Sequence, residues 1–191
     1  MKKIMMTLAA VAVAATMNAQ AYIGGSLGFT QDHVSNSKVS TNMFTVAPEI
    51  GYNLNDKFAV GVALEYTYNG TTGAHHTNKY GINPYVRYTA IKAGNFSAFI
   101  DGGLNWDTEH TKGLKKNDNT FGVRVNPGIA YNVSEKVTLV AHLKNGLYFN
   151  HTWNGSFEGD ENYPAQEAAH ANHWGLDLSS LRLQIGAYYN F

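Results

Sequence analysis

The chain has 191 residues, with 14 basic and 14 acidic side chains and no cysteine. This length suits a single domain, the even charge gives no reason to expect a nucleic-acid partner, and the lack of cysteine excludes a disulfide framework. Aromatic residues make up 13% of the chain and glycines number 19. That composition is typical of β-structure with many tight turns.

The N-terminal segment has the three parts of a secretory signal peptide. Lys2 and Lys3 are its charged start, residues 4–15 form an apolar run without charge, and Ala19-Gln20-Ala21 is a small-x-small cleavage pattern. The apolar run is shorter than the roughly 20 residues that a helix needs to span a bilayer. We therefore predict a signal peptide over residues 1–19, with cleavage after residue 19 or 21, and one exported domain over residues 20–191.

The rest of the chain alternates between apolar and polar residues with a period of two, which predicts β-strands. Eight segments carry this pattern, and their residue ranges are 22–30, 43–54, 57–68, 78–90, 95–106, 120–132, 136–148 and 178–191. Pro48, Pro84 and Pro127 fall inside three of them. Because proline lacks the N–H that a strand donates, bulges or positions at the membrane interface would be the least costly sites for these prolines.

The connections between these segments alternate in length. Short ones at 53–56, 91–94 and 132–135 have the composition of hairpin turns, whereas 31–42, 69–77, 107–119 and 149–175 are long and polar. A short helical turn is expected at 165–173, inside the last of these. In an antiparallel sheet, this alternation places every long connection at one end and every short one at the other. Such asymmetry is typical of outer-membrane barrels.

The two faces of the strands differ in charge. The apolar face begins and ends on aromatic residues in most segments, while the opposite face carries Glu49, Glu65, Arg87, Asp101, Arg124, Lys144 and Arg182. A soluble barrel, such as a lipocalin-like one, would turn the apolar face inward. A membrane barrel turns it to lipid, with aromatic girdles at both interfaces and a polar lumen. Export, the aromatic ends and the strand lengths favour the membrane barrel.

The chain resembles the small outer-membrane barrels of the OmpA transmembrane-domain and OmpX type. The resemblance rests on the eight strands, the loop asymmetry, the polar lumen face and the ending LRLQIGAYYNF. It implies an all-β fold, an eight-stranded antiparallel up-and-down transmembrane β-barrel with four long external loops and three short periplasmic turns. It also implies residence in the outer membrane of a Gram-negative bacterium. The ending looks like the signal that the barrel assembly machinery reads, with Tyr189 and Phe191 as its aromatic residues.

The seven inward charges are the first candidate site. An eight-stranded barrel is only wide enough for side chains to fill it, so we expect a lumen charge network that plugs the barrel by pairing. The alternative is a narrow porin-like pore whose ion selectivity these charges set.

Histidines in the long loops are weak candidates for a metal site. His75-His76 and His170-x-x-His173 could bind Zn²⁺ or Cu²⁺ if the loops converge. The alternative is that they are solvated polar residues, and we predict no cofactor.

The function predicted from the sequence is a structural or surface-interaction role, such as adhesion or ligand contact, through the external loops. Expected partners are membrane lipid, lipopolysaccharide, the assembly machinery and an unidentified external ligand or host surface, with the barrel a monomer. A third hypothesis, after the pore, is a lipid A-modifying enzyme built on His151, Ser179 and Asp177. No compact motif supports it, so we expect no enzymatic activity.

Overall fold

The computed structural model describes residues 20–33, 40–71, 76–113, 115, 117–144, 146–154, 165, 167–177 and 183–191. The predicted signal peptide, His75, Ser179 and Arg182 lie outside these residues. Among the described residues, no helix is long and apolar enough to cross a membrane.

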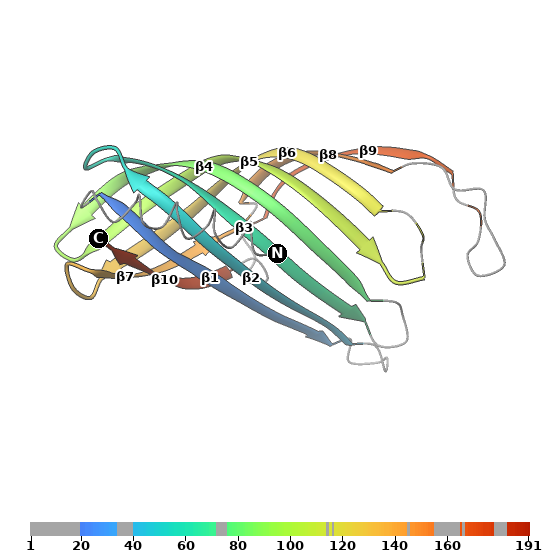
Figure 1. The fold of residues 1–191 in the computed structure, drawn as a ribbon, viewed down its shortest axis with the longest axis horizontal. Coiled ribbons are helices and arrows are strands. Elements are labelled where there is room, and N and C mark those ends of the chain that lie inside the picture. The colour runs from blue at the N-terminus through green and yellow to red at the C-terminus, as the bar shows by residue number, and fades with distance from the viewer. Residues whose placement is uncertain are drawn as a thin grey trace, which may run out of the picture.

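Ten strands form one antiparallel sheet (Figure 1). They are β1 (Ala21–His33), β2 (Ser40–Asn53), β3 (Phe58–Thr71), β4 (Thr77–Ala93), β5 (Phe96–Thr111), β6 (Asn117–Asn132), β7 (Val137–Leu143), β8 (Leu147–Asn154), β9 (Ala169–Leu176) and β10 (Leu183–Asn190). The short connections and the C-terminus lie together at the left in Figure 1. We call this the turn end and the opposite side the loop end.

Eight of the strands close into a barrel. Each of β1 to β5 pairs with the next strand, β6 pairs with β7, β7 pairs with β10, and β10 pairs with β1 from Tyr22↔Asn190 to Leu27↔Ile185. The predicted eight-stranded antiparallel barrel is therefore confirmed. Closure leaves no free sheet edge in the lipid over this part of the wall.

The last third of the chain differs from the prediction in detail. The seventh predicted strand, 136–148, is divided between β7, which ends at Leu143, and β8, which begins at Leu147. β7 pairs with the end of β6, and β8 pairs with its beginning. Within the segment expected as a long loop at 149–175, residues 149–154 and 169–175 are strand, since β8 and β9 pair antiparallel. The helical turn expected at 165–173 is wrong, because β9 starts at Ala169. Alternation weakens in this stretch, whose exposed side chains are mostly polar, so periodicity gave little signal.

The three prolines coincide with interruptions of the strand pairing. Pro48 lies in a gap of the β2–β3 ladder, Pro84 lies in a gap of the β4–β5 ladder, and Pro127 lies opposite the break between β7 and β8. Each proline thus sits where the missing N–H costs no ladder hydrogen bond.

The faces of the strands are arranged as a membrane requires. Apolar side chains point outward, as Trp106 (58% exposed) and Ile185 (62%) illustrate, while Arg124 and Asp101 inside are each 4% exposed. Aromatic rings pair on this outward face near both ends of the barrel. Phe96 and Tyr131 lie 4.6 Å apart, centroid to centroid, near the turn end, and Tyr66 and Tyr80 lie 5.2 Å apart near the loop end.

Candidate functional site

A layer of charged and aromatic side chains crosses the lumen on the side of the turn end. Arg87 on β4 donates two hydrogen bonds to Asp101 on β5, from Nε to Oδ1 at 2.7 Å and from Nη2 to Oδ2 at 2.8 Å. Its Nη2 also donates to the hydroxyl of Tyr188 on β10 at 3.1 Å. The guanidinium carbon lies 3.9 Å from the ring centroid of Phe99. Because β4 and β10 lie on opposite sides of the eight-stranded ring, Arg87 and Tyr188 bridge the lumen.

Two tyrosines and a glutamate extend this layer. The hydroxyls of Tyr22 and Tyr85 lie 2.7 Å apart, and Tyr85 donates to Glu49 Oε2 at 3.0 Å. The rings of Tyr22 and Tyr188 are 5.0 Å apart between centroids. Strands β1, β2, β4, β5 and β10 therefore all contribute to what we call the Arg87 layer.

A second layer lies nearer the loop end, around Arg124. Asn83 and Arg87 are four residues apart on β4, which separates the two layers by about 13 Å along the strand. Arg124 Nη2 donates to Asn83 Oδ1 at 2.5 Å and lies 3.7 Å from Asp107 Oδ2. Asp107 Oδ2 also accepts from Asn105 Nδ2 at 2.9 Å. Strands β4, β5 and β6 meet in this Arg124 layer.

Other inward polar groups interact with one another outside these two layers. Ser26 donates to Gln184 Oε1 at 2.9 Å, and its hydroxyl lies 3.2 Å from His142 Nε2. Lys79 Nζ lies 3.9 Å from Glu65 Oε1. A small cavity of about 40 Å³ is lined in part by Glu65, Lys79 and the buried Lys144.

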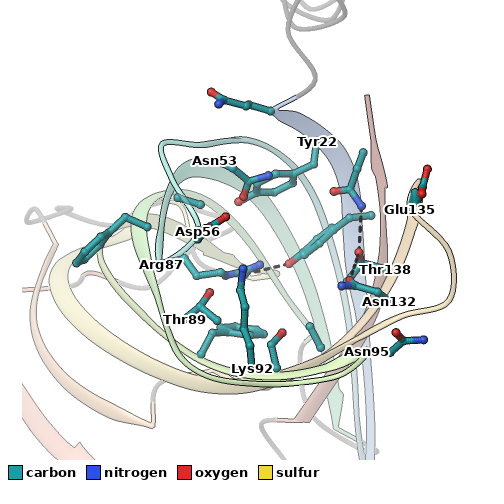
Figure 2. A pocket seen from close by; sticks show the side chains of 18 of the residues that line it. Tyr22, Asn53, Asp56, Arg87, Thr89, Lys92, Asn95, Asn132, Glu135 and Thr138 are labelled. Carbon is teal, nitrogen blue, oxygen red and sulfur yellow. Dashed lines mark hydrogen bonds between the residues drawn. The ribbon is translucent and has the colours of Figure 1, made fainter.

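A larger cavity of about 650 Å³ opens at the turn end (Figure 2). Its floor is formed by Arg87, Tyr22, Tyr188 and Phe99, and no residue of the Arg124 layer lines it. The cavity therefore stops at the Arg87 layer. We call it the turn-end cup.

Six of the seven predicted network residues are described, and all six are buried and point inward. Glu49, Arg87 and Asp101 lie in the Arg87 layer and Arg124 lies in the Arg124 layer, whereas Glu65 and Lys144 line the small cavity. Arg182 lies outside the described residues. Sequence reasoning missed the inward positions of Asp107 and Lys79. Asp107 was assigned to the edge of a loop, and extending the period-two phase of β5 by one step would have found it. Lys79 already lay on the polar phase of the predicted strand 78–90 but was not included in the network.

The histidine candidates do not converge among the described residues. His76 stacks near Tyr68 with ring centroids 5.6 Å apart, and His170 lies 5.8 Å from the ring of His151. His173 is exposed on β9, and His75 lies outside the described residues. Within the described part of the chain, no group of three or more His, Cys, Asp or Glu side chains could hold a metal ion.

The residues considered for enzymatic chemistry are also separate where they are described. His151 Nδ1 lies 2.8 Å from Asn172 Oδ1 across the β8–β9 hairpin. The backbone N–H of Asp177 donates to the carbonyl of Gly146, five residues before His151. Ser179 lies outside the described residues.

The C-terminal aromatic residues are held in the wall. The backbone N–H of Phe191 donates to the carbonyl of Ala21 at 3.0 Å, and the rings of Tyr189 and Phe191 meet edge to face at 5.2 Å. This end of the chain is therefore tied to β1 at the turn end, where these rings extend the outward aromatic face.

Residues 4–191 match the family model described as outer membrane protein beta-barrel domain. Neisserial surface protein A is similar in structure, with 17% sequence identity, a TM-score of 0.53, and coverage of 90% of this chain and 97% of that chain. The outer membrane protein OprG from Pseudomonas aeruginosa is also similar in structure, with 11% sequence identity, a TM-score of 0.53, and coverage of 90% of this chain and 94% of that chain. No curated protein matches the sequence.

Proposed function

Because the chain belongs to the outer membrane protein β-barrel domain family, we propose that its lumen is sealed and that its role is surface contact at the loop end. The protein is an integral β-barrel of the Gram-negative outer membrane. In such barrels the short turns face the periplasm and the longer connections face outward. The turn end is therefore periplasmic, and the loop end is external.

The observation that carries the sealed lumen is the bridge between Arg87 and Tyr188. It joins strands on opposite sides of the barrel, and the turn-end cup stops at it. A hydrated ion would have to separate this pair and then pass the Arg124 layer, where Asn83, Asp107 and Arg124 hold one another. Both steps would expose buried charges without their partners, which is costly.

Surface contact is supported by the β8–β9 hairpin. It runs along the top of Figure 1 toward the loop end, and β9 pairs with β8 alone among the described strands. The half-buried rings of His151 and Trp153 stack on it at 5.7 Å, beside the exposed His170. Trp174 on β9 is 79% exposed, and exposed apolar side chains rimmed by polar ones mark interaction surfaces. The similar Neisserial protein is itself named a surface protein.

The sealed lumen is tested by conductance in planar bilayers. We expect no stable conductance steps from the refolded protein, because the Arg87 and Arg124 layers block the path. Stable steps would instead favour the narrow pore, and Arg124→Ala should then change their ion selectivity.

The surface role is tested by labelling, which the absence of native cysteine makes unambiguous. We expect a membrane-impermeant maleimide to label Trp153→Cys in intact cells. Asn55→Cys, in a turn at the turn end, is the matched control and should react only after permeabilisation. Labelling of Trp153→Cys only after permeabilisation would contradict an external hairpin.

The enzyme hypothesis is tested by the mass of lipid A. Lipid A of unchanged mass in expressing cells would argue against the enzyme hypothesis.

A further inference from the structure

The turn-end cup has the size and shape of a small-molecule site. Its volume of about 650 Å³ lies within the ~300–1,000 Å³ typical of ligand pockets. The small side chains of Ala59 and Ala130 line its wall and leave this space open. A larger side chain at either position would reach into this space, so the cup depends on small residues at these two positions.

The lining of the cup is polar, with few side chains that carry a net charge. Amide and hydroxyl groups dominate, and they belong to Gln20, Asn53, Asn55, Thr89, Asn95, Ser97, Asn132, Ser134, Thr138 and Asn190. The charged members are two cations, Arg87 and Lys92, and two carboxylates, Asp56 and Glu135. Arg87 is already neutralised by Asp101. A lining with this balance favours a neutral ligand over a strongly charged one.

Some of these groups are committed to the protein itself. Asn55 Oδ1 accepts from the backbone of its own turn, and Ser134 Oγ does the same in another turn. Thr138 donates to Asn132 at 2.8 Å and accepts from Asn190 at 3.0 Å. These bonds hold the rim of the cup in a fixed shape, so little order is lost when a ligand enters.

Other groups are available to a ligand. Asn53, Lys92 and Asn95 make no side-chain hydrogen bond with any described residue. Figure 2 shows Asn53 and Lys92 on opposite sides of Arg87, both reaching toward the middle of the cup. Together they offer donors and acceptors around one space, and each amide can donate and accept at once.

We propose that the turn-end cup binds a neutral saccharide that carries acetamido and hydroxyl groups. Such a ligand has the same mixture of donors and acceptors as the free amides, and its C–H faces would pack on Ala59 and Ala130. The turn end faces the periplasm, so the saccharide comes either from the glycan strands of the cell wall or from a free oligosaccharide. This site is independent of the surface role at the loop end.

The test uses the full-length barrel in detergent micelles and triacetylchitotriose as the probe. We expect binding that is detectable by calorimetry at millimolar sugar, and weaker binding of maltotriose, which has no acetamido groups. Asn53→Ala should weaken binding about fivefold, the loss typical of one neutral hydrogen bond. Lys92→Ala should weaken it about tenfold, because a hydrogen bond from a charged group contributes more. Lys57→Ala is the matched control, because Lys57 lies in a turn at the same end but does not line the cup, and it should bind as the wild type does.

Ala130→Phe provides a second, steric test. It should abolish binding while the protein still migrates as a folded barrel on unheated gels. No binding by the wild type at about 10 mM sugar would overturn the proposal. So would unchanged binding by folded Ala130→Phe. Co-sedimentation with purified cell-wall sacculi then identifies the source, since a polymeric ligand brings the barrel down and a free oligosaccharide does not.

Discussion

Removing the carboxylate of Asp101 should destabilise the barrel more than any other single loss of a charge at the turn end. Asp101→Ala leaves the guanidinium of Arg87 buried without the two hydrogen bonds of 2.7 and 2.8 Å that it now donates. Breaking a buried pair in this way costs about 3–5 kcal/mol. Arg87 also forms the floor of the turn-end cup, where water can reach it, so we expect a value near the lower limit, about 3 kcal/mol.

The assay is urea unfolding of the protein in lipid vesicles, followed by the mobility of the folded barrel on unheated gels. The double variant Arg87→Met with Asp101→Ala removes both charges and should lose only about 1–2 kcal/mol, because no charge is left unpaired. Asp56→Ala removes an exposed carboxylate at the same end and should change stability by about 0.5 kcal/mol or less. The reasoning fails if Asp101→Ala unfolds at the wild-type urea concentration, or if the double variant is as unstable as Asp101→Ala.

Three further variants test the wall of the barrel. Ile100→Arg places a charge on the lipid-facing side of β5 and should cost about 2–4 kcal/mol in the same urea assay; a cost near zero would contradict a lipid-facing β5. Gly24→Ala brings a methyl group into collision with the carbonyl oxygen of Ala187 and should destabilise the β1–β10 closure by about 1–3 kcal/mol. Gly102→Ala is its control, because nothing lies within 4 Å of the added carbon, and equal effects of the two would refute the steric argument. Phe191→Ala should lower the amount of folded barrel in outer-membrane fractions while changing the unfolding midpoint of refolded protein little; unchanged membrane yield would count against an insertion role.

Much of the fold follows from the sequence because one physical rule, the alternation of side chains along a strand, applies to most of the chain. That rule predicts the barrel and its lipid-facing side. It does not predict where the strands end, since β5 continues to Thr111 although the predicted strand stops at residue 106. It does not predict which inward charges meet. Arg87 and Asp101 become partners through the β4–β5 register, and Arg87 meets Tyr188 only because the ring closes with β4 opposite β10. Such contacts depend on how the strands pair and how the barrel closes, and a local sequence pattern carries no information on either.

Several lumen charges of the described residues lie close to a partner of opposite sign. The buried carboxylates are Glu49, Glu65, Asp101 and Asp107, and the buried Lys and Arg side chains are Arg87, Arg124 and Lys144. Arg87 pairs with Asp101, Arg124 lies beside Asp107, and Lys79 lies beside Glu65. Such pairing is what the proposed sealed lumen requires. The polar residues at every second position of each strand have another effect. They interrupt any run of about 20 apolar residues, which would otherwise be retained in the inner membrane as a transmembrane helix. The inward charges therefore serve two demands on this chain: they keep the strands polar enough to be exported, and they supply the ion pairs on which the proposed sealed lumen depends.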